Sequence, residues 1–215
     1  NGNSTPCTVT ITIADNLPPT AVCMDITVQL DELGDGSIAS ADNTSSQIDG
    51  GSTDNCGPLT FSESMTEFDC ENVGANTVTL TVTDASGNMS TCDATVTVED
   101  NVPPVITVTP QTVVLSDDDG TATLTVADLA SATDACGIAS LTASQLLFTC
   151  EDIGEVAVTI TATDNNGNVS TSPVTVTVEF NQPELACIGE INLTLNEDCQ
   201  ALLIPRMVLV GNVAC

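Results

Sequence analysis

Alternating apolar and polar residues run through several segments of the chain. Residues 77–83 place Val78, Leu80 and Val82 on one face and threonines on the other, and residues 157–163 repeat this arrangement. A period of two with many β-branched residues is typical of half-buried antiparallel strands. The same pattern predicts further strands at residues 9–13 (Val9, Ile11 and Ile13), 92–98 and 172–178.

Short turns separate these strands. Residues 84–88 (Asp-Ala-Ser-Gly-Asn) and residues 164–168 each predict a hairpin. Each half of the chain also opens with an apolar strand, followed by a Gly-containing acidic turn and a short strand at residues 37–40 or 121–126. No segment longer than a turn or two has helical periodicity with caps. Several short strands in about 80 residues predict a small immunoglobulin-like β-sandwich, with a barrel as the alternative.

The strands belong to a tandem repeat. Asp-Asn-Leu-Pro-Pro at 15–19 returns as Asp-Asn-Val-Pro-Pro at 100–104, and in altered form as Phe-Asn-Gln-Pro at 180–183. A fixed period with matched punctuation indicates an array of one domain. The predicted domains are the last strand of a preceding repeat (1–15), a first immunoglobulin-like repeat (16–100), a second (101–180) and the start of a further, divergent β domain (181–215). We therefore expect the chain to be a piece of a longer protein.

Charge and composition narrow the function. The chain has 30 acidic residues, one basic residue (Arg206) and no histidine, for a net charge of -29. Nucleic acids and anionic membranes attract Lys and Arg, so neither is an expected partner, and no apolar run is long enough for membrane insertion. Nucleophilic catalysis by a Ser-His or Cys-His pair needs a histidine, and phosphate-binding loops need a lysine. We expect no enzyme.

Ten cysteines indicate disulfides. Neither a C-x-x-C pair nor a histidine is present to build a typical zinc site, so the protein is expected to be secreted, in an extracellular or cell-surface location. Cys56 and Cys70 recur as Cys136 and Cys150 at the same separation. The simplest assignment pairs them within each repeat, as Cys56–Cys70 and Cys136–Cys150. Each bond would close a loop of about 15 residues, worth roughly 3 kcal/mol.

A joint absence predicts a second kind of disulfide. Cys23 and Cys92 stand near the start and end of the first repeat, and the second repeat has Val108 and Ser172 at the matching positions. A lone thiol is a liability in an oxidising space, so the loss of both indicates that Cys23 and Cys92 are partners. Of the other cysteines, Cys7 and Cys187 are assigned to partners outside the chain, and Cys199 and Cys215 to each other.

Acidic and amide side chains predict calcium binding. Asp84 and Asn88 lie in one hairpin turn, and Glu99, Asp100 and Asn101 lie at the junction between repeats. Calcium takes six to eight oxygen ligands from such groups. The candidate set also includes Asp54 and, in the second repeat, Asp134 and Asp164. The alternative is structural, because Asp and Asn suit turns through backbone hydrogen bonding alone.

The spaced motifs resemble a known family. They are Asp-Asn-Cys-Gly (54–57), Phe-x-Cys-x-x-x-Gly (68–74), Thr-x-Thr-Asp-x-x-Gly-Asn (81–88) and Val-Thr-Val-Glu-Asp-Asn-x-Pro-Pro (96–104). This series resembles hyalin-repeat (HYR) domains, in the version found in large surface proteins of Bacteroidetes. The tail after residue 190 is similar to another module of those proteins. The resemblance implies an immunoglobulin-like fold, secretion, and a role in adhesion or surface fibres.

The expected function is structural. The chain is predicted to be a stalk or fibre segment of a large extracellular or cell-surface adhesin, acting as an extended, crosslinked spacer in a rod-like array. One alternative is a calcium-dependent glycan- or protein-binding adhesion module. Another is a subunit of an extracellular filament that assembles through exposed strand edges. The expected partners are neighbouring repeats of the same chain, further copies of it, or a surface ligand.

Overall fold

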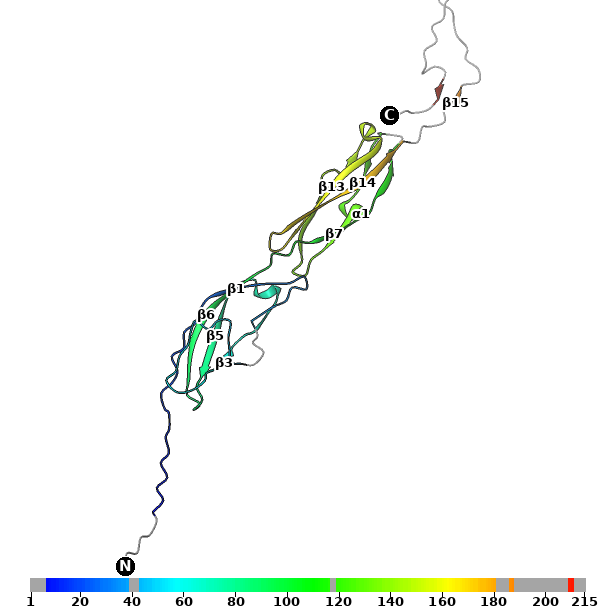
Figure 1. The fold of residues 1–215 in the computed structure, drawn as a ribbon. Coiled ribbons are helices and arrows are strands. Elements are labelled where there is room, and N and C mark those ends of the chain that lie inside the picture. Colours follow the sequence, from blue (N-terminus) through cyan, green and yellow to red (C-terminus); the bar gives the residue numbers. More distant parts are fainter. Residues whose placement is uncertain (1–6, 39–42, 117–118, 181–185, 188–208, 211–215) are drawn as a thin grey trace, which may run out of the picture. The chain divides into compact units, whose positions relative to one another are not determined.

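The chain forms two compact units, Asn1–Val102 and Pro103–Cys215 (Figure 1). The computed structural model describes residues 7–38, 43–116, 119–180, 186–187 and 209–210. The elements of the first unit are β1 (Ile26–Gln29), β2 (Gly36–Ser37), β3 (Thr60–Glu63), β4 (Glu67–Phe68), η1 (Cys70–Asn72), β5 (Gly74–Thr83) and β6 (Met89–Glu99). Those of the second are β7 (Val105–Val108), β8 (Gln111–Val114), β9 (Ala122–Thr123), α1 (Val126–Leu129), β10 (Ala130–Thr133), β11 (Ile138–Ala143), β12 (Leu147–Phe148), η2 (Cys150–Asp152), β13 (Gly154–Asp164), β14 (Val169–Glu179), β15 (Ala186–Cys187) and β16 (Leu209–Val210).

A four-stranded sheet with the same strand order forms one layer of each unit. The order is β1-β6-β5-β3 in the first unit and β8-β14-β13-β11 in the second. The long hairpins β5–β6 and β13–β14 are antiparallel and run side by side in Figure 1, as the alternating sequence predicted. The first strand of each sheet is instead parallel to the last, with β1 along β6 and β8 along β14. Each unit is therefore an all-β, immunoglobulin-like sandwich.

Short strand pairs form the opposing layer. In the first unit these are β2–β4 and the isolated bridges Thr20↔Thr53 and Cys23↔Asp49, and in the second they are β7–β10 and β9–β12. Apolar side chains fill the space between the layers. The predicted inward face of β5 (Val78, Leu80 and Val82) is fully buried. In the second unit Phe148 is fully buried within a cluster of aliphatic side chains.

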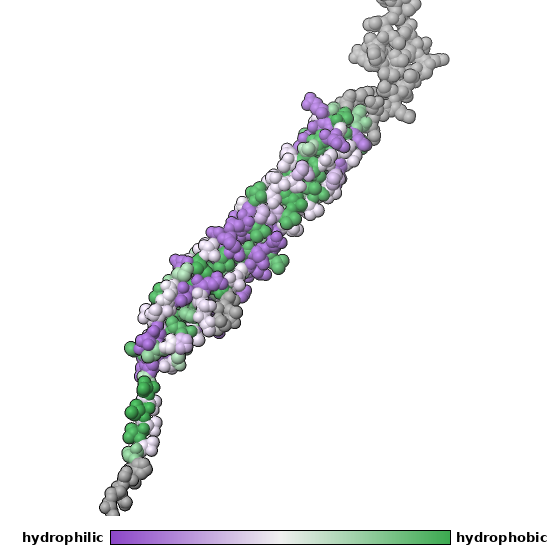
Figure 2. Space-filling model, in the orientation of Figure 1, coloured by the Kyte–Doolittle hydropathy of each residue, from purple (hydrophilic) through white to green (hydrophobic). Residues whose placement is uncertain are grey.

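Two local predictions were wrong. The predicted strand 121–126 is reduced to β9, because Val126 begins the one-turn helix α1, whose capping box joins Thr125 and Asp128. The predicted strand at residues 9–13 does not form, because no described segment pairs with it. Its apolar side chains are exposed (Figure 2), with Ile13 94% accessible. Among the described residues no helix is long and apolar enough to cross a membrane.

The two ends of each sandwich differ. One end, here called the hairpin end, carries the β5–β6 turn or the β13–β14 turn. The other, here called the 3-10 end, carries η1 or η2 immediately before β5 or β13. Because β5 has 10 residues and β13 has 11, the two ends are about 30 Å apart in each unit.

Candidate functional site

Asp84 organises the hairpin end of the first unit. Its Oδ1 accepts hydrogen bonds from the backbone N–H groups of Ser86 (2.8 Å) and Asn88 (2.9 Å). Its Oδ2 accepts a bond of 2.7 Å from Nδ2 of Asn88. The Asn88 side chain is the largest cause that holds the pKa of Asp84 below its ordinary value. Asp84 is therefore charged at neutral pH although its side chain is buried.

Asn88 also fixes the segment that precedes the first repeat's opening strand. Its Nδ2 donates to the carbonyl oxygens of Asp15 (3.2 Å) and Leu17 (3.4 Å). The hydroxyl of Ser90 donates to the carbonyl oxygen of Pro19 at 2.6 Å. These contacts bring Asp15 to the hairpin end. Sequence reasoning did not include Asp15 in the candidate set, although it is the first residue of the repeated Asp-Asn-x-Pro-Pro motif.

Three carboxylates meet at this end and are here called the acidic triad. One carboxylate oxygen from each of Asp15, Asp54 and Asp84 lies within 4.8 Å of the others. Oδ2 of Asp54 accepts the backbone N–H of Cys56 at 2.7 Å. Oδ2 of Asp15 is buried and has no hydrogen-bond partner. A buried carboxylate oxygen without a hydrogen-bond partner is unfavourable, so this atom is suited to binding a cation.

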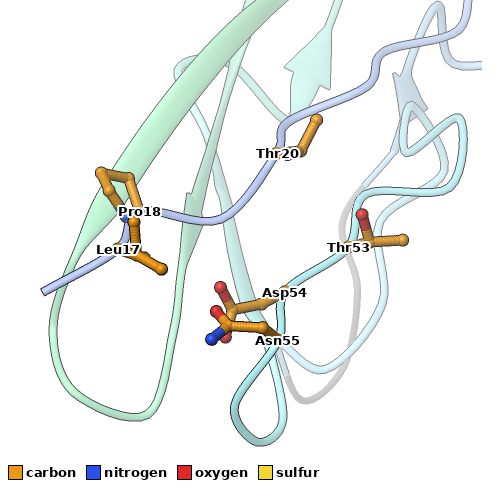
Figure 3. Close-up of a pocket in the computed structure, with 6 residues that line it drawn as sticks. All are labelled: Leu17, Pro18, Thr20, Thr53, Asp54 and Asn55. Atoms are coloured by element: carbon orange, nitrogen blue, oxygen red, sulfur yellow. The ribbon is translucent and has the colours of Figure 1, made fainter. Parts of the chain in front are cut away.

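A hollow of about 460 Å³ adjoins the triad. The carboxylate of Asp54 and the amide of Asn55 face it from one side, and Leu17 and Pro18 from the other (Figure 3). The described residues contain no Lys, Arg or His, so no basic side chain among them neutralises the three carboxylates. Oxygen donors of this kind fit calcium, which Asp15, Asp54 and Asp84 would hold.

The second unit repeats the turn chemistry. Oδ1 of Asp164 accepts from the backbone N–H groups of Asn166 (2.9 Å) and Asn168 (2.8 Å), and Oδ2 accepts from Nδ2 of Asn168 (2.8 Å). Burial raises the pKa of Asp164, but the hydrogen bonds from Asn168 and its neighbours together lower this pKa by more, so the net shift is downward. Asp134 stabilises the adjacent loop by accepting the backbone N–H of Cys136 at 2.8 Å.

The predicted calcium ligands of the first repeat do not form one site. Asp84 and Asn88 lie at the hairpin end, whereas Glu99 ends β6 at the opposite end of the sandwich and Asp100 and Asn101 follow it. Oε2 of Glu99 accepts from Gln29 (2.7 Å) and Asn101 (3.2 Å). Oδ1 of Asp100 accepts the backbone N–H of Val102 at 3.0 Å. The 11-residue strand between the two groups is the physical reason for the separation.

The structure contains the predicted first-to-last disulfide. Cys23 and Cys92 are bonded, with their Cα atoms 5.8 Å apart. Cys23 belongs to the layer of short pairs and Cys92 to β6, so the bond joins the two layers. This pairing was predicted from the sequence and is confirmed.

The predicted pairing of Cys56 with Cys70 is wrong. Cys56 is a free, exposed thiol, whereas Cys70 takes part in a disulfide. The reason is the length of β5, since Cys56 lies at the hairpin end and Cys70 at the 3-10 end. The predicted Cys136–Cys150 bond is wrong for the same reason, because Cys136 contacts Asn165 in the β13–β14 turn whereas Cys150 begins η2 at the other end of β13. Cys7 is also free and exposed. The side chain of Cys187, and both Cys199 and Cys215, lie outside the described residues.

Comparisons with known proteins find a domain family that matches the first repeat. Residues 14–98 match the HYR domain family. The chain is 32% identical over 206 residues to Hyalin of Strongylocentrotus purpuratus, which covers 90% of this chain and 17% of that protein.

Among solved structures, human CDH23 EC21-23 aligns with a TM-score of 0.41 at 15% identity, covering 92% of this chain and 80% of that one. The fibronectin(III)-like modules of Clostridium thermocellum CbhA align with a TM-score of 0.29 at 14% identity, covering 77% and 95%. On the family match, residues 14–98 form an HYR-like domain.

Proposed function

We propose that the chain is a stalk or fibre segment of a large extracellular or cell-surface adhesin. The observation that supports this most directly is the path of the chain through each sandwich. The parallel pairing of first and last strands means that each repeat is entered at one end and left at the other. Domains of this kind extend an array with each added repeat rather than folding it back.

The contacts at each end define this path. In the first unit the chain enters beside Asn88 at the hairpin end, and leaves where Val98 pairs with Gly74 at the 3-10 end. In the second it enters where Val105 pairs with Thr133, and leaves where Val178 pairs with Gly154. The Asp-Asn-x-Pro-Pro segments between repeats are stiffened by proline. Mutual repulsion of acidic surfaces further favours extension.

The Cys23–Cys92 bond supports an extracellular location and a mechanical role. Disulfides persist in oxidising spaces. The bond encloses residues 24–91, which cannot be pulled out of the repeat while it is intact. The 70 residues from Cys23 to Cys92 could otherwise span roughly 240 Å when extended. Tension along the array would therefore pass from Cys23 to Cys92 without unravelling the sheet.

Small-angle X-ray scattering of the whole chain tests the spacer role. A single compact body of this length would have a radius of gyration of about 17 Å, and an unfolded chain about 50 Å. We expect a value clearly above the first and below the second, with β-type circular dichroism showing that the repeats are folded. A radius near that of the compact body would contradict the proposal.

Calcium binding at the acidic triad is the second candidate function. It would make the chain a calcium-dependent adhesion module, or stiffen the entry to the first repeat. The supporting observation is the buried, unpartnered Oδ2 of Asp15 beside two further carboxylates, in a described region that has no basic side chain.

Replacing Asp54 by Asn should remove one calcium site. The amide retains an oxygen for the backbone N–H of Cys56 but removes one ligand charge, so we expect affinity at this site to fall roughly tenfold or more. Calorimetric titration with calcium chloride measures the loss. Glu32→Gln removes the same charge from an exposed turn and serves as the control. Equal titrations for both variants and the parent chain would eliminate the site.

A further inference from the structure

The turn that closes the long hairpin of the second unit differs from that of the first in its centre. Residues 84–88 read Asp-Ala-Ser-Gly-Asn and residues 164–168 read Asp-Asn-Asn-Gly-Asn, so Asn166 stands where the first unit has Ser86. The residue that follows Asn166 is Gly167, whose φ is 95°. This left-handed conformation favours glycine, so the second turn places an asparagine directly before a glycine that the backbone requires.

The side chain of Asn166 is exposed to solvent. It makes no hydrogen bond with the described residues, whereas the other two asparagine side chains of the turn are both engaged. Nδ2 of Asn165 donates to the Cys136 carbonyl oxygen at 2.7 Å, and Nδ2 of Asn168 donates to Oδ2 of Asp164 at 2.8 Å. Asn166 is therefore the one asparagine of this turn whose amide group is free to change its direction.

Gly167 leaves its own backbone nitrogen unshielded. This glycine is exposed, and a Cβ added to it would meet no atom within 4 Å. Because glycine has no side chain, nothing on Gly167 hinders the approach of its nitrogen to the Asn166 side chain. The two reacting atoms, the nitrogen of Gly167 and Cγ of Asn166, are also held close by the chain itself, which gives them a high effective concentration for each other.

We propose that Asn166 is a site of spontaneous deamidation, which the matching turn of the first repeat lacks. The backbone nitrogen of Gly167 attacks Cγ of Asn166. A new C–N bond forms, the Cγ–Nδ2 bond breaks, and ammonia leaves with the proton that the Gly167 nitrogen gives up. Water then opens the resulting succinimide at either carbonyl carbon and yields aspartate or isoaspartate. Asparagine and water are consumed, and the acid and ammonia are produced, with no oxidation. This inference does not depend on the proposed stalk function.

The modification disturbs the hydrogen bonds that hold the turn. Oδ1 of Asp164 accepts the backbone N–H groups of Asn166 at 2.9 Å and of Asn168 at 2.8 Å. Isoaspartate adds a methylene group to the main chain, so these two N–H groups can no longer both point at one carboxylate oxygen. The new charge near Asp164 is also repulsive. The bonds from Asn165 to the carbonyl oxygens of Cys136 and of the next residue would then loosen, because the turn holds Asn165 in place.

Peptide mapping of the folded chain after incubation at neutral pH tests the site. Cleavage after glutamate at mildly acidic pH, where deamidation is slow, releases residues 156–179 as one peptide that contains Asn165, Asn166 and Asn168. We expect mass spectrometry to show loss of the Asn166 amide, while the two neighbouring asparagines keep theirs. The other Asn-Gly pair of the sequence, at residues 1–2, falls in a different peptide.

A sample kept in denaturant defines the incubation time, which ends when its Asn166 has been converted. No conversion of Asn166 in the folded chain over the same time would show that the folded turn protects this side chain, and would overturn the proposal. Equal loss at Asn165 or Asn168 would also overturn it, because the specific role of Gly167 would then be absent.

Two variants separate the reaction from its structural effect. Asn166→Ser copies the turn of the first repeat, so its hydrogen exchange in this turn should not change on incubation. Asn166→Asp carries the new charge without the longer main chain. We expect the turn amides to exchange faster in the isoaspartate fraction of the incubated parent chain than in Asn166→Asp. An isoaspartate fraction that exchanges as slowly as the fresh chain would show that the turn tolerates the longer main chain, and the inferred loosening would be wrong.

Discussion

Replacing Cys23 and Cys92 together by serine should destabilise the first repeat by roughly 4 kcal/mol and leave the second unchanged. The bond joins residues separated by 69 positions in the sequence. In the chain-entropy model, closing a loop of this length raises the free energy of the unfolded state by about 4 kcal/mol. Both cysteines are only half-buried, so serine adds little desolvation to this loss. The effect is large because a small domain has a total stability of about 5–15 kcal/mol.

Hydrogen exchange measured by mass spectrometry can report each repeat separately. The chain has no Trp or Tyr, but peptides from β5 and β13 distinguish the two units. A loss of about 4 kcal/mol corresponds to roughly a thousandfold faster exchange of β5 amides that open by global unfolding. The β13 amides serve as the internal control. A change of less than tenfold in β5 would show that packing, not the disulfide, stabilises the first repeat.

The reciprocal variant uses the natural difference between the repeats. Ser172 pairs with Ile160 in the second unit as Cys92 pairs with Leu80 in the first, and Val108 holds the position of Cys23. Val108→Cys with Ser172→Cys should form a bond and slow exchange in β13. Equal protection with and without that bond would show that a disulfide at this position adds no stability to the second repeat.

The sequence was sufficient for the long hairpin strands and for one disulfide. Alternation identified Val78, Leu80 and Val82 as inward-facing because a period of two is a local property of a strand. The Cys23–Cys92 bond could be predicted because both cysteines are absent together from the second repeat, and this identifies them as partners without any knowledge of their distance in space.

Long-range geometry was not available from the sequence. A separation of 14 residues between Cys56 and Cys70 suits a hairpin, and only the position of each at an opposite end of β5 rules out the bond. Alternation also says nothing about strand direction, so the parallel pairing of β1 with β6 was not predicted. Asp15 was missed as a candidate ligand because Asn88, 73 residues away, holds it at the hairpin end.

Replacing Phe148 by Ala should unfold the second repeat, whereas Phe68→Ala should leave the first repeat folded. Phe148 is fully buried, and Phe68 is 3% exposed at the matching position in the first repeat. Truncating a buried Phe to Ala costs about 3–5 kcal/mol in either core. The first repeat can tolerate this loss because Cys23–Cys92 adds roughly 4 kcal/mol that the second repeat does not have.

The comparison separates covalent from packing contributions. Circular dichroism would show the loss of about half the β signal in Phe148→Ala, and hydrogen exchange would assign that loss to β13 rather than β5. Adding Phe68→Ala to the chain that lacks Cys23 and Cys92 should then unfold the first repeat as well, because both repeats would depend on equally reduced cores. If Phe68→Ala alone unfolds the first repeat while Phe148→Ala is tolerated, the second repeat must have a source of stability greater than the Cys23–Cys92 bond, and this prediction would be wrong.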